Sequence, residues 1–328
     1  MKTLILNADE VSQLLPMKEC VPVMREALTA LATGQVHQPL RTITRPPGVK
    51  GVMGLMPAFM SGEHAAFGLK AICVFPGNSA IGKDSHQGGV LLFSAVTGEL
   101  MSIMNASAIT AIRTAAVSGV ATDLLARTDA GNLAIIGSGV QARAHLAAMA
   151  EVRSIKHCRI ASRHLEKAQR FTEELQQDFS FALEPVATVE EALVDADLIV
   201  TATTAVEPIV KREWISPGAH LNVVGSSVAT RREVDSETMA AASLFVDRRE
   251  STVNEGGDYL FALSDGAIAP DHIRAELGEV LIGEKSGRTS TDEITLFKSL
   301  GIAIEDLFAA EHLYRKAKEL SIGTWVEC

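Results

Sequence analysis

The amino-acid sequence predicts an α/β protein in which a doubly wound parallel sheet is inserted into a discontinuous α+β domain. Three observations lead to this fold class: strands and helices alternate from about residue 133 onward, a glycine-rich turn precedes the first of these helices, and short strands broken by Pro and Gly come before them. Alternating strands and helices are typical of parallel β-α-β units, whereas short strands separated by turn residues are typical of antiparallel or mixed sheets. With 328 residues, the chain has room for two domains of roughly 100–200 residues each.

The first part of the sequence predicts one helix followed by a sheet. Apolar residues at helical spacing indicate a helix at 17–33, which Gly34 ends. A second, longer helix is expected at 107–125, after the sheet. The strand-like runs between these helices lie at 41–44, 51–57, 67–75, 90–96 and 100–104.

The second part of the sequence predicts the parallel sheet. Strands are expected at 133–136, 158–161, 198–203, 221–224 and 244–246, and helices at 140–150, 165–177 and 188–194. A final amphipathic helix at 305–318 is expected to return to the first sheet. We therefore place one domain at 119–303 and the other at 1–118 together with 304–328.

Composition and charge disfavour several classes of protein. The chain has 40 acidic and 30 basic residues, a net charge of −10 and no basic block, which disfavours nucleic-acid binding. The first ten residues lack a basic region followed by an apolar run, and the longest uncharged stretch, 214–230, is broken by Pro and Gly. We therefore expect no secretory signal, no membrane span and a cytoplasmic location. Four scattered cysteines without a C-x-x-C pair predict reduced thiols and no metal site.

A glycine-rich turn predicts a dinucleotide site. Gly137, Gly139 and Ala142 form the pattern G-x-G-x-x-A directly after an apolar strand and at the start of a helix. Gly137 permits the tight turn, Gly139 lets the backbone approach a pyrophosphate, and Ala142 leaves room where the helix crosses the strand. The N–H groups of the helix N-terminus favour phosphate. A structural turn and a methyltransferase loop are the alternatives, but the continuing strands and helices favour a Rossmann-type domain.

The residues after the second strand favour NADP over NAD. A site for NAD places an acid about 20 residues after the glycine turn, where it binds the ribose 2′-OH. Here Ser162, Arg163 and His164 occupy that region, and the first carboxylate is Glu166. A guanidinium suits a 2′-phosphate, although exposed loop residues would look the same.

Three cations lie where the sequence pattern predicts burial. Arg113 falls on the apolar stripe of the helix at 107–125, and Lys70 shares a strand face with Ile72 and Val74. Arg41 is a less clear case, because its strand alternates poorly. Burying such a charge is costly unless an anion meets it, so the cations either pair with carboxylates of the protein or bind a substrate carboxylate beside the nicotinamide. Two such cations just before a dinucleotide domain favour the substrate pocket, although each head group could also reach solvent.

Several segments resemble the ornithine cyclodeaminase/mu-crystallin family over nearly the whole chain. The most distinctive are the R-T-A-A run at 113–116 and the G-x-G-x-Q-A turn at 137–142. The other segments that carry the resemblance lie at 54–58, 69–70, 85–87, 109–112, 218–225 and 297–301.

The resemblance implies a homodimer whose N- and C-terminal segments form a substrate-binding and dimerisation region around the Rossmann domain. It implies that Arg41, Lys70 and Arg113 hold the substrate carboxylate and that His86 lies near the nicotinamide. The cofactor contacts that we expect are Gly137, Gly139, Val140, Gln141, Ser162, Arg163, His164, Thr203, Val224, Gly225, Ser226, Ser85 and Thr114.

One departure from the family pattern bears on the reaction. Members that cyclise ornithine carry an aspartate shortly after the Val-Gly pair, and here the stretch 226–233 has none, which disfavours cyclodeamination. We predict NAD(P)H-dependent reduction of a cyclic 2-imino acid, such as Δ1-pyrroline-2-carboxylate or Δ1-piperideine-2-carboxylate, to the L-amino acid. Lys70 or a water near His86 is the candidate proton donor. The alternatives are an amino-acid dehydrogenase, an iminosuccinate reductase, an ornithine cyclodeaminase and a non-catalytic protein that binds NADPH and an acid.

Overall fold

The chain divides into two compact units, residues 1–114 with 302–328 and residues 115–301. The domain boundaries predicted from the sequence fall after residues 118 and 303. The computed structural model describes residues 2–327, apart from the side chains of residues 79 and 80. Helix α3 (Ala106–Leu125) contains one of the two points of division.

The first unit is built on a mixed sheet of eight strands in the order β16-β1-β7-β6-β5-β4-β2, with β3 paired to β4. Only β1 and β7 run parallel, and the other neighbours are antiparallel. The strands are β1 (Lys2–Leu6), β2 (Val36–His37), β3 (Thr42–Thr44), β4 (Val52–Met60), β5 (Ala66–Val74), β6 (His86–Ser94), β7 (Leu100–Asn105) and β16 (Thr324–Glu327). The prediction of a mixed sheet is confirmed, but the short strands β1, β2 and β16 were not predicted, because so few residues carry little periodicity.

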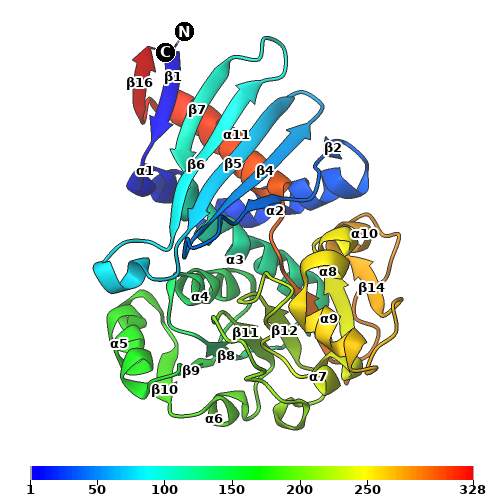
Figure 1. The fold of residues 1–328 in the computed structure, drawn as a ribbon. Helices are drawn as coiled ribbons and strands as arrows, with labels where there is room; N and C mark the ends of the chain where they lie inside the picture. Colours follow the sequence, from blue (N-terminus) through cyan, green and yellow to red (C-terminus); the bar gives the residue numbers. More distant parts are fainter. Residues whose placement is uncertain (1, 328) are drawn as a thin grey trace. The chain divides into compact units, whose positions relative to one another are not determined.

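Helices cover one face of this sheet. They are α1 (Ala8–Leu14), α2 (Met17–Ala32) and α11 (Ala303–Leu320). Figure 1 shows α11 crossing the sheet, where it packs on β4, β5 and β6. Gly68 on β5 makes this approach possible, because a Cβ atom there would lie 2.8 Å from Leu307 Cδ1. The predicted return of the last helix to the first sheet is therefore confirmed.

The second unit contains a fully parallel sheet in the order β10-β9-β8-β11-β12-β15-β13-β14. The first five strands have the Rossmann order 3-2-1-4-5. The strands are β8 (Asn132–Ile136), β9 (His157–Ala161), β10 (Ala182–Val186), β11 (Leu198–Thr201), β12 (His220–Val223), β13 (Ser243–Val246), β14 (Ile273–Glu276) and β15 (Thr295–Lys298). Strands β10, β14 and β15 were not predicted, and β11 ends two residues earlier than expected, so Thr203 lies in the loop after it.

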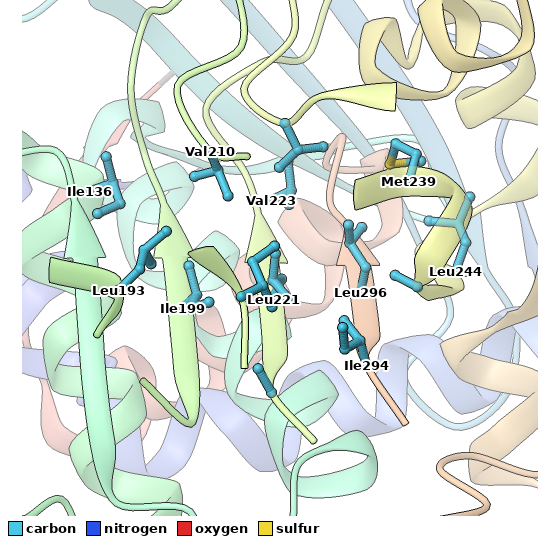
Figure 2. Close-up of a cluster of buried hydrophobic side chains, with 14 of the residues drawn as sticks. Ile136, Leu193, Ile199, Val210, Leu221, Val223, Met239, Leu244, Ile294 and Leu296 are labelled. Atoms are coloured by element: carbon cyan, nitrogen blue, oxygen red, sulfur yellow. The ribbon is translucent and has the colours of Figure 1, made fainter. Parts of the chain in front are cut away.

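The helices of the second unit follow the strands, and an apolar core lies against the sheet. These helices are α4 (Val140–Val152), α5 (Leu165–Leu175), α6 (Val189–Leu193), α7 (Ser236–Ala241), α8 (Arg249–Glu255), α9 (Gly257–Ser264) and α10 (Leu277–Leu281). Figure 2 shows the core side chains Ile199, Leu221 and Leu296, from three neighbouring strands, packed together. Burial of this apolar surface is the main source of stability of the unit.

Helix α3 has the length and hydropathy of a membrane span. Its mean hydropathy is 1.3, but 72% of the window that meets this test is buried within the protein. Such burial is typical of a core helix, because a membrane span exposes its apolar side chains to lipid.

Candidate active site

The glycine-rich turn has the strand–turn–helix context that the sequence predicted. Gly137 follows β8 with φ of +129°, and a Cβ atom on it would lie 2.5 Å from the carbonyl oxygen of Ala202. Gly139 caps α4, and a Cβ atom there would meet no atom within 4 Å. Ala142 is fully buried. The open space at Gly139 and the unsatisfied N–H groups of the first turn of α4 fit a pyrophosphate.

An unpaired acceptor lies beside this turn. Gln141 Oε1 is buried and has no hydrogen-bond partner among residues 2–327. A buried acceptor without a donor is costly, so a donor from a bound molecule would stabilise it. The hydroxyl groups of a nucleotide ribose are donors of this kind. The neighbouring Val140 is 60% exposed, on the outer side of the first turn.

The end of β9 joins the glycine turn through a hydrogen bond. Ser162 Oγ and Ser138 Oγ are 2.9 Å apart. Arg163 and His164 are exposed at the N-terminus of α5, and the first acid after them is Glu166, in the first turn of that helix. A basic and hydroxyl-bearing group without a carboxylate therefore follows β9.

The carboxyl ends of β11 and β12 are tied together by a glutamate that the sequence did not single out. Glu233 is fully buried. Its carboxylate accepts hydrogen bonds from Thr201 Oγ1 (2.8 Å), Thr203 N (2.8 Å), Thr203 Oγ1 (2.7 Å) and Gly225 N (2.7 Å). Thr203 and Gly225 are predicted cofactor contacts, so Glu233 holds two parts of the expected site against each other. Burial raises the pKa of Glu233, while Lys298 opposes this shift.

Two more buried charged side chains, Asp258 and Lys298, lie close to the turn at 224–226. Asp258 accepts from Glu233 N (2.7 Å) and forms an ion pair with Lys298 (2.9 Å). Lys298 donates to the carbonyl oxygen of Ser226 (2.5 Å), and Ser226 Oγ donates to the carbonyl oxygen of Arg231 (2.7 Å). The turn at 224–226 is therefore held by side chains from three segments of the second unit.

In the first unit, Lys70 and Arg113 meet at the first turn of α11. Lys70 Nζ lies 2.7 Å from Asp306 Oδ2, Arg113 Nε lies 3.1 Å from Asp306 Oδ1, and Arg113 also bonds Glu305. Both cations are 3% exposed, so the predicted burial is correct. We refer to Lys70, Arg113, Glu305 and Asp306 as the buried tetrad. Both cations therefore pair with carboxylates of the protein, which the sequence offered as the alternative to binding a substrate carboxylate.

This pairing leaves donors for a further anion. A guanidinium has five N–H donors and an ammonium has three. Among the described residues, Glu305 and Asp306 engage two donors of Arg113, and Asp306 engages one of Lys70. The carboxylates neutralise the two cations without using all of their donors, and their position in the first turn of α11 is favoured by the helix dipole.

The surroundings of the tetrad change the acidity of two basic groups. Burial, together with the charge of Arg113, lowers the pKa of Lys70 to about 8, although Asp306 opposes the shift. Desolvation, followed by the charges of Lys70 and Arg113, lowers the pKa of His86. His86 begins β6, and its Nδ1 lies 3.0 Å from Ser85 Oγ. Lys70 and His86 are therefore electrostatically coupled, and the lowered pKa of Lys70 suits proton transfer near neutral pH.

Strand register relates Arg41 to Lys70. Arg41 is half-buried and directly precedes Thr42, which pairs with Leu55. The next residue, Met56, pairs with Lys70. Since neighbouring strands lie about 4.8 Å apart, the backbone of Arg41 is about 10 Å from that of Lys70. Thr114, another predicted contact, is buried directly after Arg113.

Sequence reasoning did not single out Glu233, Glu305 or Asp306. Glu305 and Asp306 fall in the first turn of the last predicted helix, where acids are common for reasons of helix dipole alone. In the second unit the available signals were Lys298, which directly follows the apolar residues Leu296 and Phe297, and the acid Asp258. Each of these residues is buried.

The fold and these residues define a two-domain α/β protein with a Rossmann-type nucleotide-binding unit. A sequence model of the ornithine cyclodeaminase/mu-crystallin family matches residues 1–321. The chain belongs to this family.

Individual members of the family are similar along nearly their whole length. The chain is 40% identical to ketimine reductase mu-crystallin of Mus musculus over 313 residues, covering 94% of this chain and 96% of the relative. It is 39% identical to the structure of Thermococcus litoralis Δ1-pyrroline-2-carboxylate reductase with NADH and L-proline, with a TM-score of 0.95 and coverage of 98% and 99%. An archaeal alanine dehydrogenase dimer with bound NAD has a TM-score of 0.92 at 32% identity, covering 100% of this chain and 99% of that one.

These comparisons confirm the predicted family and fold class. The relatives named as reductases confirm the prediction of an oxidoreductase that acts on C–N bonds with NAD(P)H. The roles of the individual site residues stay predictions.

Proposed function

We propose that the protein reduces a cyclic 2-imino acid to the L-amino acid with NAD(P)H. The observation that carries this proposal is the buried pair of cations, Lys70 and Arg113, bridged by Asp306 in a chain of this family. The similar structure with NADH and L-proline supports the cofactor class and a five-membered cyclic product.

The cations position the substrate through its carboxylate. Lys70 and Arg113 donate their remaining N–H groups to the carboxylate, and Arg41, directly before β3, adds a third positive charge. Fixing the anionic end places the imine carbon at one position, which lowers the barrier by orientation. Bound NAD(P)H supplies the hydride that the imine carbon accepts.

Proton transfer is assigned to Lys70, with a water near His86 as the alternative. The C=N nitrogen must carry a proton when the carbon accepts hydride, so that a neutral secondary amine results. A lysine with a pKa of about 8 keeps most of its protons at pH 7 yet gives them up more readily than an ordinary lysine. Its ammonium is a suitable donor to the imine nitrogen.

A substrate panel tests the reaction. Purified protein is mixed with NADPH or NADH and either Δ1-pyrroline-2-carboxylate or Δ1-piperideine-2-carboxylate, and the absorbance of the reduced cofactor is followed. We expect a decrease well above background with at least one imine, and L-proline or L-pipecolate as product. Failure of every 2-imino acid to consume the cofactor would refute the proposal.

A second candidate is an amino-acid dehydrogenase. The whole-chain similarity to an alanine dehydrogenase of Archaeoglobus fulgidus, at 33% identity, favours it. This activity predicts faster turnover with pyruvate and ammonia than with either cyclic imine. The same assay, compared by kcat/KM, therefore separates the two candidates.

We further propose that Arg163 gives a preference for NADPH. Arg163→Asp is expected to weaken NADPH binding by about ten- to a hundredfold, the equivalent of one or two charge-assisted hydrogen bonds, and to spare NADH. Titration of cofactor fluorescence measures the dissociation constants of NADPH and NADH. Arg170→Asp is the control, because this exposed residue of α5 carries the same charge further from the helix N-terminus. Equal losses for NADPH and NADH in Arg163→Asp would exclude a role in 2′-phosphate recognition.

We also propose a homodimer formed by the sheet face opposite α11. This face is apolar and open: Phe67 is 49% and Met53 41% exposed, and the ring centroids of Phe59 and Phe67 lie 4.8 Å apart with the rings tilted by 44°. An uncovered apolar patch of this kind marks an interface, and a similar alanine dehydrogenase is described as a dimer. The cytoplasmic location stays a prediction from the sequence.

A charge at the centre of this face should dissociate the dimer. Leu69 pairs with Pro57 on one side and Leu91 on the other. We expect Leu69→Glu to halve the mass measured by light scattering, because a buried unpaired carboxylate is costly. Val96→Glu, at a 92% exposed turn position, should stay dimeric. An unchanged mass for Leu69→Glu would place the interface elsewhere.

A further inference from the structure

Glu233 uses both carboxylate oxygens to join two loops at the carboxyl edge of the parallel sheet. Oε1 accepts from the backbone N–H of Thr203, and Oε2 accepts from the backbone N–H of Gly225. A backbone N–H cannot reverse its direction, so each loop needs an acceptor at its own position. A carboxylate supplies two acceptors, whereas an amide of the same shape supplies only one. The geometry therefore requires glutamate rather than glutamine.

The loop after β11 and the loop after β12 are in direct contact at Gly225. A Cβ atom at Gly225 would lie 2.2 Å from the carbonyl oxygen of Thr203 and 2.4 Å from Glu233 Oε1. Only a glycine fits between them. The position of the Gly225 turn is therefore set by Glu233 and by the loop after β11.

The backbone of Glu233 is itself fixed by a buried ion pair. Asp258 accepts from Glu233 N and from Val234 N (3.1 Å), and its other oxygen meets Lys298. Lys298 in turn holds the carbonyl oxygen of Ser226, one residue beyond Gly225. Hydrogen bonds from both sides thus hold the 225–226 turn.

Burying these charges is energetically unfavourable, so a role in stabilising the fold alone does not explain them. Glu233, Asp258 and Lys298 are at most 1% exposed, and when ionised they sum to one uncompensated negative charge. Buried charges of this kind are often replaceable by apolar residues without loss of stability. Their location offers a functional reason, because a ligand of a doubly wound sheet lies outside the carboxyl ends of the strands. The nucleotide half bound at β8 and β9 is the adenosine, and the half at β11 and β12 is the nicotinamide.

We propose that Glu233 is a positioning residue that shapes the nicotinamide end of the cofactor site and leaves the adenosine end unaffected. This inference rests on the proposed use of NAD(P)H. Glu233 is too deeply buried to touch the cofactor, so it acts through Thr203 and the turn at 225–226. Its removal should therefore weaken a whole dinucleotide but not a fragment that contains only the adenosine half.

The test compares two ligands in Glu233→Gln. NADPH and 2′,5′-ADP (or NADH and ADP, if the wild type binds NADH better) are titrated by calorimetry. We expect the affinity for the dinucleotide to fall by at least about tenfold, which is at least ~1.4 kcal/mol of binding free energy. The affinity for the fragment should stay within about twofold of the wild-type value. An equal loss for both ligands, or no loss for either, would overturn the inference.

Two further variants separate positioning from general destabilisation. Thr201→Val removes one donor to Glu233 at a fully buried strand position and preserves side-chain shape, so it should give a smaller, severalfold loss for the dinucleotide alone. Asp197→Asn is the control: this carboxylate holds the backbone N–H groups of Gly131 and Asn132 through Oδ2 and Arg127 through Oδ1, at the amino end of β8. Asp197→Asn should lower the melting temperature without changing the ratio of the dissociation constants for the dinucleotide and the fragment.

The outcomes also distinguish this inference from the proposed function. A wild-type protein that binds neither dinucleotide refutes both. A wild-type protein that binds and reduces imines, with a Glu233→Gln variant of unchanged dinucleotide affinity, refutes only the positioning role. If Glu233→Gln does not fold, a Thr201→Val variant without selective loss of the dinucleotide refutes it.

Discussion

Replacing Arg113 by methionine is expected to abolish imine reduction and to lower the free energy of unfolding by about 3–5 kcal/mol. Arg113 lies between Glu305 and Asp306, which are 0% and 2% exposed. Without the guanidinium, two buried carboxylates face the single charge of Lys70. Urea unfolding and the NADPH assay measure the two effects.

A double variant separates the structural role of Arg113 from its role in substrate binding. Arg113→Met with Glu305→Gln removes one charge of each sign and leaves the Lys70–Asp306 pair intact. We expect this variant to regain much of the lost stability while staying inactive, because the donors for the substrate carboxylate are still missing. Recovery of activity together with stability would show that Arg113 serves only the fold.

The rate of imine reduction is expected to fall as the pH rises above about 8, close to tenfold per pH unit. The direction follows from the assigned role: the proton donor is the ammonium form of Lys70, and burial lowers its pKa to about 8, so the active form disappears above that pH. The reverse reaction, oxidation of the amino acid, needs the neutral amine and should rise over the same range. The pH profile of kcat with saturating imine and NADPH measures this break.

Asp306→Asn provides the discriminating variant for this pH dependence. Asp306 raises the pKa of Lys70, so its removal should move the break to lower pH. The imine substrate titrates identically in both proteins and cannot cause a difference between them. Lys316→Gln removes an ion pair with Glu19 that does not involve the tetrad, and should leave the break in place. A break that does not move in Asp306→Asn would exclude Lys70 as the donor.

Much of the fold could be predicted because it depends on local patterns. The glycine turn needs only a strand, two glycines and a helix in direct succession, and the structure has them as β8, Gly137 to Gly139, and α4. Period-2 alternation in β5 and period-3.6 spacing in α3 correctly predicted that Lys70 and Arg113 are buried. Strands such as β10 and β15 were missed because four or five residues without flanking turn signals carry too little periodicity.

The sequence by itself determined the fold class, the family and the position of the nucleotide-binding turn, because each of these is written in residues close together in the chain. Only the tertiary structure decided what the buried charges meet. Arg113 bonds Asp306 across 193 positions, and Glu233 reaches Thr201 across 32. Such pairings depend on which helix packs on which strand. The hydrophobic periodicity of a segment does not depend on which acidic residue packs against it, so it cannot predict that partner. The physical reason is that burial follows from local spacing, whereas charge compensation follows from packing between distant segments.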